Sequence, residues 1–151
     1  MKKLLIPSIF FVLLISFSFA QKPYKVVFYN LENFFDTIND PEVLDDEFTP
    51  DGPKKWNTAK YNKKLNNTER VLFDIAAIDK NYPIVIGVSE VETRGVLEDI
   101  VATPKLAPAN YRIAHFDSPE ARGVDVAFLY RPDVFKIEGQ YPVKTVIPSL
   151  P

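Results

Sequence analysis

Residues 83–92 read PIVIGVSEVE, a short apolar run that ends in two glutamates. The run from Ile84 to Val88 is mostly β-branched and follows a proline, which is typical of a strand buried on both faces. Strands of this kind lie in the middle of parallel sheets. We therefore expect a central strand, with Glu90 and Glu92 at or just past its carboxyl end.

A second strand and a helix precede this run. Tyr24 to Asn30 is rich in β-branched and aromatic residues and predicts a buried strand that ends in a polar side chain. A helix is predicted to begin with Asn57 or Thr58 as its N-cap. Strand, helix and strand form a βαβ unit, which predicts an α/β fold. The helix positions expected to be buried are Tyr61, Leu65, Thr68, Leu72, Ile75 and Ile78.

The segment between the first strand and the helix, Asn33 to Trp56, is acidic and interrupted by prolines, which predicts a long surface loop. The exposed helix face is basic. We favour a solvated face over a phosphate-binding track for it. Its basic residues are Lys60, Lys63, Lys64 and Arg70.

After the central strand, Thr93 is expected to cap a short helix that runs through Val101. Two apolar runs, Tyr111–Phe116 and Val124–Tyr130, predict an antiparallel hairpin around the loop 117–123. A last strand is predicted near Phe135–Gly139.

The amino terminus resembles a secretory signal peptide. Two lysines precede the apolar run Leu4–Phe19, and small residues lead up to a cleavage site after Ala20. A membrane anchor is the alternative, but the run is short for a membrane span. We therefore expect a signal peptide at 1–20, a domain at 21–151, and a protein exported to the periplasm or the extracellular space, with no membrane contact after cleavage.

Composition excludes several classes of protein. The chain has 151 residues, a formal net charge of −2 and no cysteine. This argues against a polycationic nucleic-acid binder and against a disulfide-stapled domain. Any site that binds an anion must therefore come from a local group of residues and not from the overall charge of the chain.

Asn30 and Glu90 follow two strands whose carboxyl ends meet at one edge of the sheet. Mg²⁺ prefers oxygen ligands and is held by one or two carboxylates, so this pair suits a metal site. The spacing alone also allows ordinary roles: Asn30 in a turn and Glu90 as a helix cap. Glu92 follows Glu90 by two residues, so on a regular strand both side chains point to the same side of the sheet. Glu92 is therefore the competing ligand.

Three ordered segments, residues 26–36, 86–92 and 117–131, resemble the endonuclease/exonuclease/phosphatase family, which includes pancreatic deoxyribonuclease, exonuclease III and sphingomyelinases. The resemblance implies a deoxyribonuclease-like α/β sandwich of two sheets. It also implies a metal-dependent phosphodiesterase, most of all an exported nuclease. Glu90 and Asn30 would then be the metal pair, for Mg²⁺ or alternatively Mn²⁺ or Ca²⁺.

The third segment contains Arg122 and Asp125, where the resemblance implies catalytic residues that contact phosphate or orient a histidine. A plain salt bridge between the two is the alternative. His115 is the only histidine. A lone histidine on an apolar strand is more often a hydrogen-bonded structural residue than an acid or base.

The chain departs from the family pattern in its second half. The Asn-His, Gly-Asp-x-Asn and Asp-His segments of the family do not occur here. We therefore expect only the first half of the sandwich, inactive by itself and completed by a partner chain or a missing C-terminal half. The expected substrate is nucleic acid or another phosphodiester. The alternatives are a non-catalytic truncated or split product, and a phosphomonoesterase or lipid phosphodiesterase.

Overall fold

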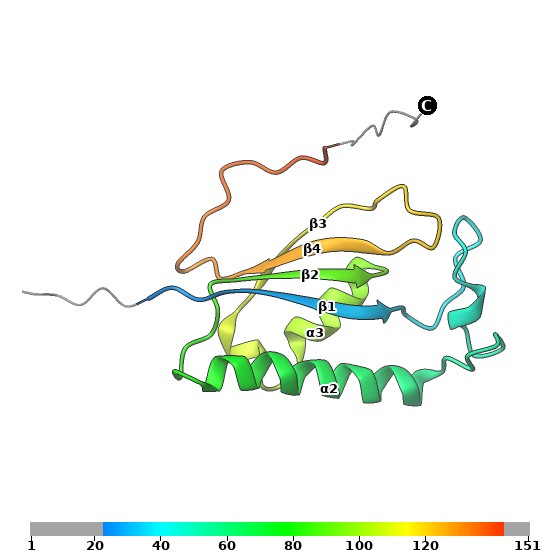
Figure 1. Ribbon diagram of the computed structural model, residues 1–151, viewed down its shortest axis with the longest axis horizontal. Helices are drawn as coiled ribbons and strands as arrows, with labels where there is room; N and C mark the ends of the chain where they lie inside the picture. Colours follow the sequence, from blue (N-terminus) through cyan, green and yellow to red (C-terminus); the bar gives the residue numbers. More distant parts are fainter. Residues whose placement is uncertain (1–22, 144–151) are drawn as a thin grey trace, which may run out of the picture.

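The computed structural model describes residues 23–143, and these residues build one four-stranded sheet (Figure 1). The signal peptide predicted at 1–20 lies outside the described residues. The strands follow the spatial order β1, β2, β4, β3. β1 and β2 are parallel, whereas β4 runs antiparallel to both β2 and β3. The bounds are β1 Val26–Phe34, β2 Val85–Val91, β3 Arg112–His115 and β4 Asp125–Tyr130.

Helix α2 (Thr58–Ala77) connects the parallel strands, which confirms the predicted βαβ unit. Asn57 is its N-cap, and the Asn57 side chain accepts a hydrogen bond from the backbone N–H of Lys60 at 3.1 Å. Helix α3 (Arg94–Ala102) is capped by Thr93, as expected. Two short 3-10 turns, η1 (Asp46–Phe48) and η2 (Ala107–Ala109), were not expected from the sequence.

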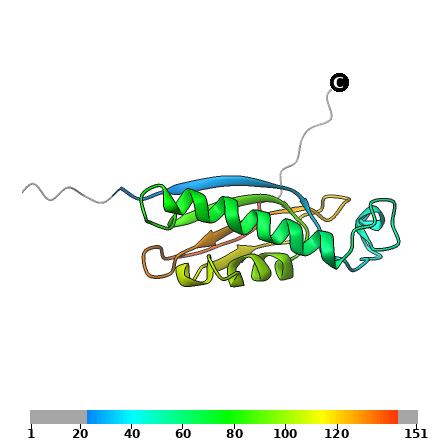
Figure 2. The ribbon, with the colours of Figure 1, turned by 90° about the horizontal axis from the view of Figure 1, so that it is seen from below.

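The core lies between the two helices and one face of the sheet. Figure 2 shows α2 and α3 next to each other when the molecule is seen from below. Leu31, Ile86 and Leu129 point from the strands toward Leu72 of α2 and Leu97 of α3, and all five are buried. Within residues 23–143, no helix is both long and apolar enough to cross a membrane.

The opposite face of the sheet carries large apolar side chains that are exposed. Phe28 on β1 is 70% exposed and Phe128 on β4 is 54% exposed, and their neighbours Val26 and Val126 are exposed too. The segment that follows β4 contributes residues 135–143 to the wall of an open groove over part of this face. The described residues therefore form two layers, with apolar surface left on the outer side of the sheet.

Strand β1 and the loop after it differ from the sequence prediction. The strand continues past Asn30 to Phe34 through an irregular register. The following loop is more than a surface loop, because Phe35 is buried and stacks on Phe48 with ring centroids 4.0 Å apart. Trp56 Nε1 also donates a hydrogen bond to the carbonyl of Phe35 at 3.0 Å. A small aromatic cluster thus anchors the acidic loop.

Two predictions near element ends were wrong. Ile78 is 81% exposed, because α2 ends at Ala77 and Ala76 takes the buried position of the last turn. The strand predicted at Phe135–Gly139 does not form. The chain turns at Arg131, whose carbonyl accepts the N–H of Phe135 at 2.8 Å, and leaves the sheet without pairing to a strand of the described part. Alternating polarity predicts a strand only where a sheet edge is within reach.

Candidate active site

Asn30 and Glu90 meet at the carboxyl end of the two parallel strands. Asn30 Nδ2 donates a hydrogen bond to Glu90 Oε1 at 3.1 Å, and the backbone N–H of Asn33 donates to Glu90 Oε2 at 3.0 Å. Asn30 Oδ1 accepts the N–H of Glu32 at 2.7 Å, so Asn30 also has the turn role that the sequence allowed. Glu90 does not cap α3, because Thr93 does. The structure thus brings the predicted pair together.

The backbone around this pair is irregular in a way that aims the side chains. Glu32, Asn33 and Glu90 have φ values of 56°, 58° and 58°, in the left-handed region that residues other than glycine rarely adopt. The pairing register shifts between Asn30 and Phe34 on β1, and between Ser89 and Val91 on β2. Strained residues of this kind cluster at functional sites. These bulges turn the Glu90 carboxylate toward Asn30.

Glu92 does not join this pair, so the parity argument that made it a competing ligand was wrong. The bulge at Glu90 interrupts the alternation of the strand, and β2 ends at Val91. Glu92 is only 7% exposed, and its Oε2 accepts the N–H of Asp36 at 2.6 Å. Burial is the largest cause that raises the pKa of Glu92 to about 8, and the nearby charges of Asp36 and Asp45 contribute to this rise.

Asp45 is the residue of this end of the sheet that sequence reasoning missed. It is 1% exposed, and its Oδ2 accepts the N–H of Asp40 at 2.9 Å. Its Oδ1 has no hydrogen-bond partner among the described residues. Six other acidic residues share the segment 33–56 with Asp45 and nothing distinguishes it from them, so no pattern pointed to its burial. Its carboxyl group therefore closes a hydrogen bond within the acidic loop and lies near Glu92.

Arg122 reaches the same end of the sheet from the loop between β3 and β4. Its Nη1 donates to Asn33 Oδ1 at 3.0 Å, and its Nε pairs with Glu120 Oε1 at 3.1 Å. Arg122 is exposed, so its guanidinium remains accessible to an anion. The alternative of a salt bridge between Arg122 and Asp125 is wrong, because the carboxylate partner of Arg122 is Glu120.

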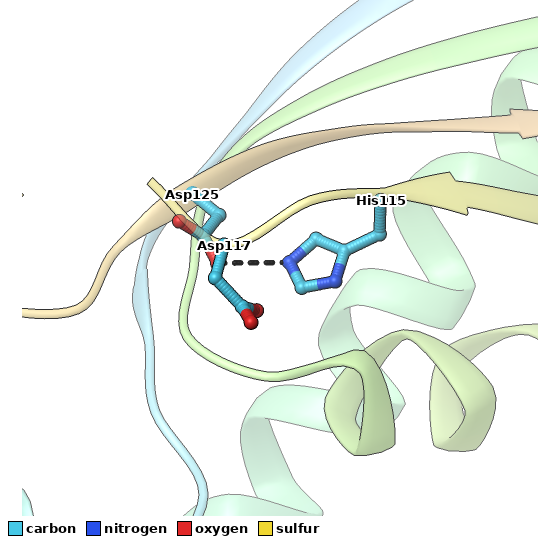
Figure 3. A group of neighbouring side chains, drawn as sticks. All are labelled: His115, Asp117 and Asp125. Carbon is cyan, nitrogen blue, oxygen red and sulfur yellow. Dashed lines mark hydrogen bonds and ion pairs between the residues drawn. The ribbon is translucent and has the colours of Figure 1, made fainter. Parts of the chain in front are cut away.

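Asp125 is instead the partner of His115. His115 Nε2 lies 2.8 Å from Asp125 Oδ2, and both side chains are buried (Figure 3). Asp125 Oδ1 accepts the N–H of Ser118 at 2.7 Å. His115 is therefore hydrogen-bonded, as expected for a structural histidine. Asp125 begins β4 opposite Val91 of β2, two strands away from Asn30.

A pocket of about 330 Å³ lies between β1 and α2, directly beside Asn30. Lys60, Lys63 and Lys64 line it. Lys63 is exposed, as predicted for a solvated helix face, but Lys64 is half-buried and donates to the carbonyl of Glu32 at 2.6 Å. Burial lowers the pKa of the Lys64 ammonium. The sequence prediction of a solvated face was therefore wrong for Lys64.

These features define an α/β domain with a cluster of polar and acidic side chains at the carboxyl end of its parallel strands. The model of the Endonuclease/Exonuclease/phosphatase family matches residues 25–150, so the chain belongs to this family. At the level of the family, it is a hydrolase of phosphoric esters, from a group that generally uses divalent metals. No curated protein and no solved structure gives a significant match.

Proposed function

We propose that this protein is an exported, metal-dependent phosphodiesterase that acts on nucleic acid. The contact between Asn30 and Glu90 is the observation that carries the proposal. It joins a carboxylate and a carboxamide from neighbouring parallel strands at the edge where α/β sheets bind their ligands. Membership of the family supports phosphoric ester hydrolysis, and the predicted signal peptide supports export.

The donor atoms of this pair suit Mg²⁺. Glu90 offers two carboxylate oxygens that each accept only one hydrogen bond, which leaves further lone pairs, and Asn30 Oδ1 accepts only the N–H of Glu32 while its Nδ2 donates to Glu90. Mg²⁺ is commonly held by one or two carboxylates while keeping several waters. Glu90 would hold the ion, with Asn30 beside it. A bound Mg²⁺ polarises a phosphoryl oxygen and stabilises the leaving oxygen of the ester.

The surrounding residues favour a polyanionic substrate. Lys60 and Lys63 line the pocket beside Asn30 and are exposed, and Arg122 presents an exposed guanidinium next to Asn33. Cationic groups near a metal site can contact phosphates that flank the reacting one. A monoester would engage only one of these groups.

Residues 21–151 by themselves should turn over no substrate at a significant rate. The only histidine is engaged by Asp125, and the sequence contains no Gly-Asp-x-Asn segment of the kind that handles the attacking water in the family. Loss of the general acid and base groups costs many orders of magnitude in rate.

The function is tested with the product of the complete reading frame that encodes this chain. We expect Mg²⁺-dependent nicking of plasmid DNA that is abolished by chelation and by Glu90→Gln. The chain 21–151 serves as the control for contamination. Hydrolysis of phosphomonoesters without hydrolysis of DNA, RNA or a small diester would contradict the proposal, and so would nicking that survives Glu90→Gln.

A further inference from the structure

A separate group of metal-binding side chains lies where β3 and β4 join the loop 117–123. His115, Asp117 and Asp125 each offer one nitrogen or oxygen atom, and these atoms all lie within 4.8 Å of one another (Figure 3). Zn²⁺ binds such atoms at about 2.0–2.2 Å, which places tetrahedral ligand atoms about 3.3 Å apart. We propose that these three residues bind a first-row transition-metal ion such as Zn²⁺ or Co²⁺.

His115 and Asp125 already stand close to the geometry of a bound pair. The 2.8 Å between His115 Nε2 and Asp125 Oδ2 needs to widen by only about 0.5 Å to match neighbouring ligands of a tetrahedral ion. The cation replaces the proton that lies between these two atoms. Neutral imidazole then carries its single proton on Nδ1 and offers the lone pair of Nε2 to the metal.

Asp125 has the outer contact that orients a ligating carboxylate. The backbone N–H of Ser118 donates to Asp125 Oδ1 at 2.7 Å, which leaves Oδ2 to face His115. Metal-binding carboxylates are themselves usually hydrogen-bonded in this way. Because this donor is a backbone amide, it cannot rotate away from the carboxylate.

The site is closed on the protein side and open on the solvent side. The side chains of His115 and Asp125 are 4% and 3% exposed, whereas Asp117 is exposed and can rotate to complete the set. Two carboxylates around one imidazole carry excess negative charge, and an ion that they coordinate offsets the cost of burying one of them. Solvent would supply the fourth ligand.

The nitrogen donor distinguishes this site from the pair Asn30 and Glu90. Imidazole suits Zn²⁺ and Co²⁺, whereas sites built from oxygen alone suit Mg²⁺. A metal held by Asp117 and Asp125 would join the two ends of the loop that carries Arg122. Arg122 donates to Asn33 at the candidate active site, so the ion would stiffen this contact.

One property of the sequence allows the imidazole ligand of a bound ion to be identified directly. The chain has one histidine and no cysteine, so an ion bound with an imidazole ligand must use His115. We would record the imidazole ring signals by NMR in tag-free protein during titration with Zn²⁺, in the presence of excess Mg²⁺. The expected result is a shift of the His115 signals that saturates at one equivalent of Zn²⁺.

Variants separate this site from other acidic groups. Because Asp117 is exposed, Asp117→Asn should fold normally and weaken Zn²⁺ binding by about tenfold or more. Two substitutions should leave the response of the His115 signals to Zn²⁺ unchanged. They are Asp51→Asn, which changes an exposed acid of the loop after β1, and Glu90→Gln. Unshifted His115 signals at millimolar Zn²⁺ would overturn the proposal. Equal Zn²⁺ affinity in Asp117→Asn and the unmodified chain would overturn it too.

Discussion

Asn30 Nδ2 and Glu90 Oε1 lie 3.1 Å apart although sixty residues separate them in the chain. The parallel pairing of β1 and β2 brings their carboxyl ends together, and Asn30 pairs in register with Ser89, the residue before Glu90. The remaining gap is closed by the bulge that gives Glu90 a positive φ. The strained backbone at Glu90 therefore brings the two side chains into the contact on which the proposed metal site depends.

Lys64→Gln should destabilise the fold by about 1–2 kcal/mol. The Lys64 ammonium donates to the carbonyls of Glu32 and Asn33 at 2.6 and 3.3 Å, and removing this donor leaves the part-buried carbonyl of Asn33 without it, as well as the more exposed carbonyl of Glu32. Urea unfolding followed by circular dichroism would measure the loss. Lys63→Gln, on the exposed side of the same helix, is the matched control and should change stability by less than about 0.5 kcal/mol. Equal effects of the two substitutions would show that the Lys64 contacts do not stabilise the end of β1.

Stability should fall as the pH rises from about 4.5 to about 8. The pKa of Glu92 is raised to about 8 in the fold, from an ordinary value of 4.5, by burial and by the charges of Asp36 and Asp45. The folded state therefore holds a proton that the unfolded state has released, and this difference costs stability across that interval. The loss should reach a few kcal/mol at pH 8.

Glu92→Gln tests this pH dependence, because the amide keeps the shape and cannot ionise. Thermal melts in EDTA across pH 5 to 8 should be flatter for Glu92→Gln than for the unmodified chain. Parallel curves for the two proteins would mean that Glu92 does not hold its proton in the fold.

The outer face of the sheet should bind a hydrophobic dye and promote self-association. Phe28 and Phe128 are exposed on adjacent parts of this face, together with Val26 and Val126. Apolar patches larger than a few hundred Å² are rare on monomers. Phe128→Thr should reduce dye fluorescence and shift the protein toward the monomer in analytical ultracentrifugation.

Ile78→Thr provides the control for the outer face, because Ile78 is just as apolar and exposed but lies at the end of α2. Ile78→Thr should leave the dye fluorescence and the sedimentation of the protein unchanged. A dye-free monomer before any substitution would contradict the prediction.

Much of the fold could be predicted from local sequence patterns. The apolar run at Ile84–Val88 correctly indicated the central strand, and Asn57 and Thr93 correctly marked helix starts, because capping depends on residues close together in the chain. The strand predicted at Phe135–Gly139 was wrong because pairing depends on a partner that local alternation does not reveal.

The candidate site also has features that could be predicted from the sequence and features that could not. Asn30 and Glu90 could be placed together from topology alone, since parallel strands align their carboxyl ends. The burial of Asp45, the removal of Glu92 from the pair and the anchoring of Lys64 could not be predicted. Each of these features depends on bulges in the strands or on how a loop packs against the sheet. The local sequence does not reveal either.

Calorimetric titration of Mn²⁺ or Mg²⁺ into the chain and into Glu90→Gln tests the proposed metal site most directly. Glu92→Gln is the matched control, since it removes a carboxylate two residues away that faces Asp36 instead of Asn30. We predict that Glu90→Gln weakens metal binding about tenfold or more, because it removes the one carboxylate of the pair, and that Glu92→Gln leaves the affinity unchanged. Equal affinity in Glu90→Gln and the unmodified chain would contradict the account.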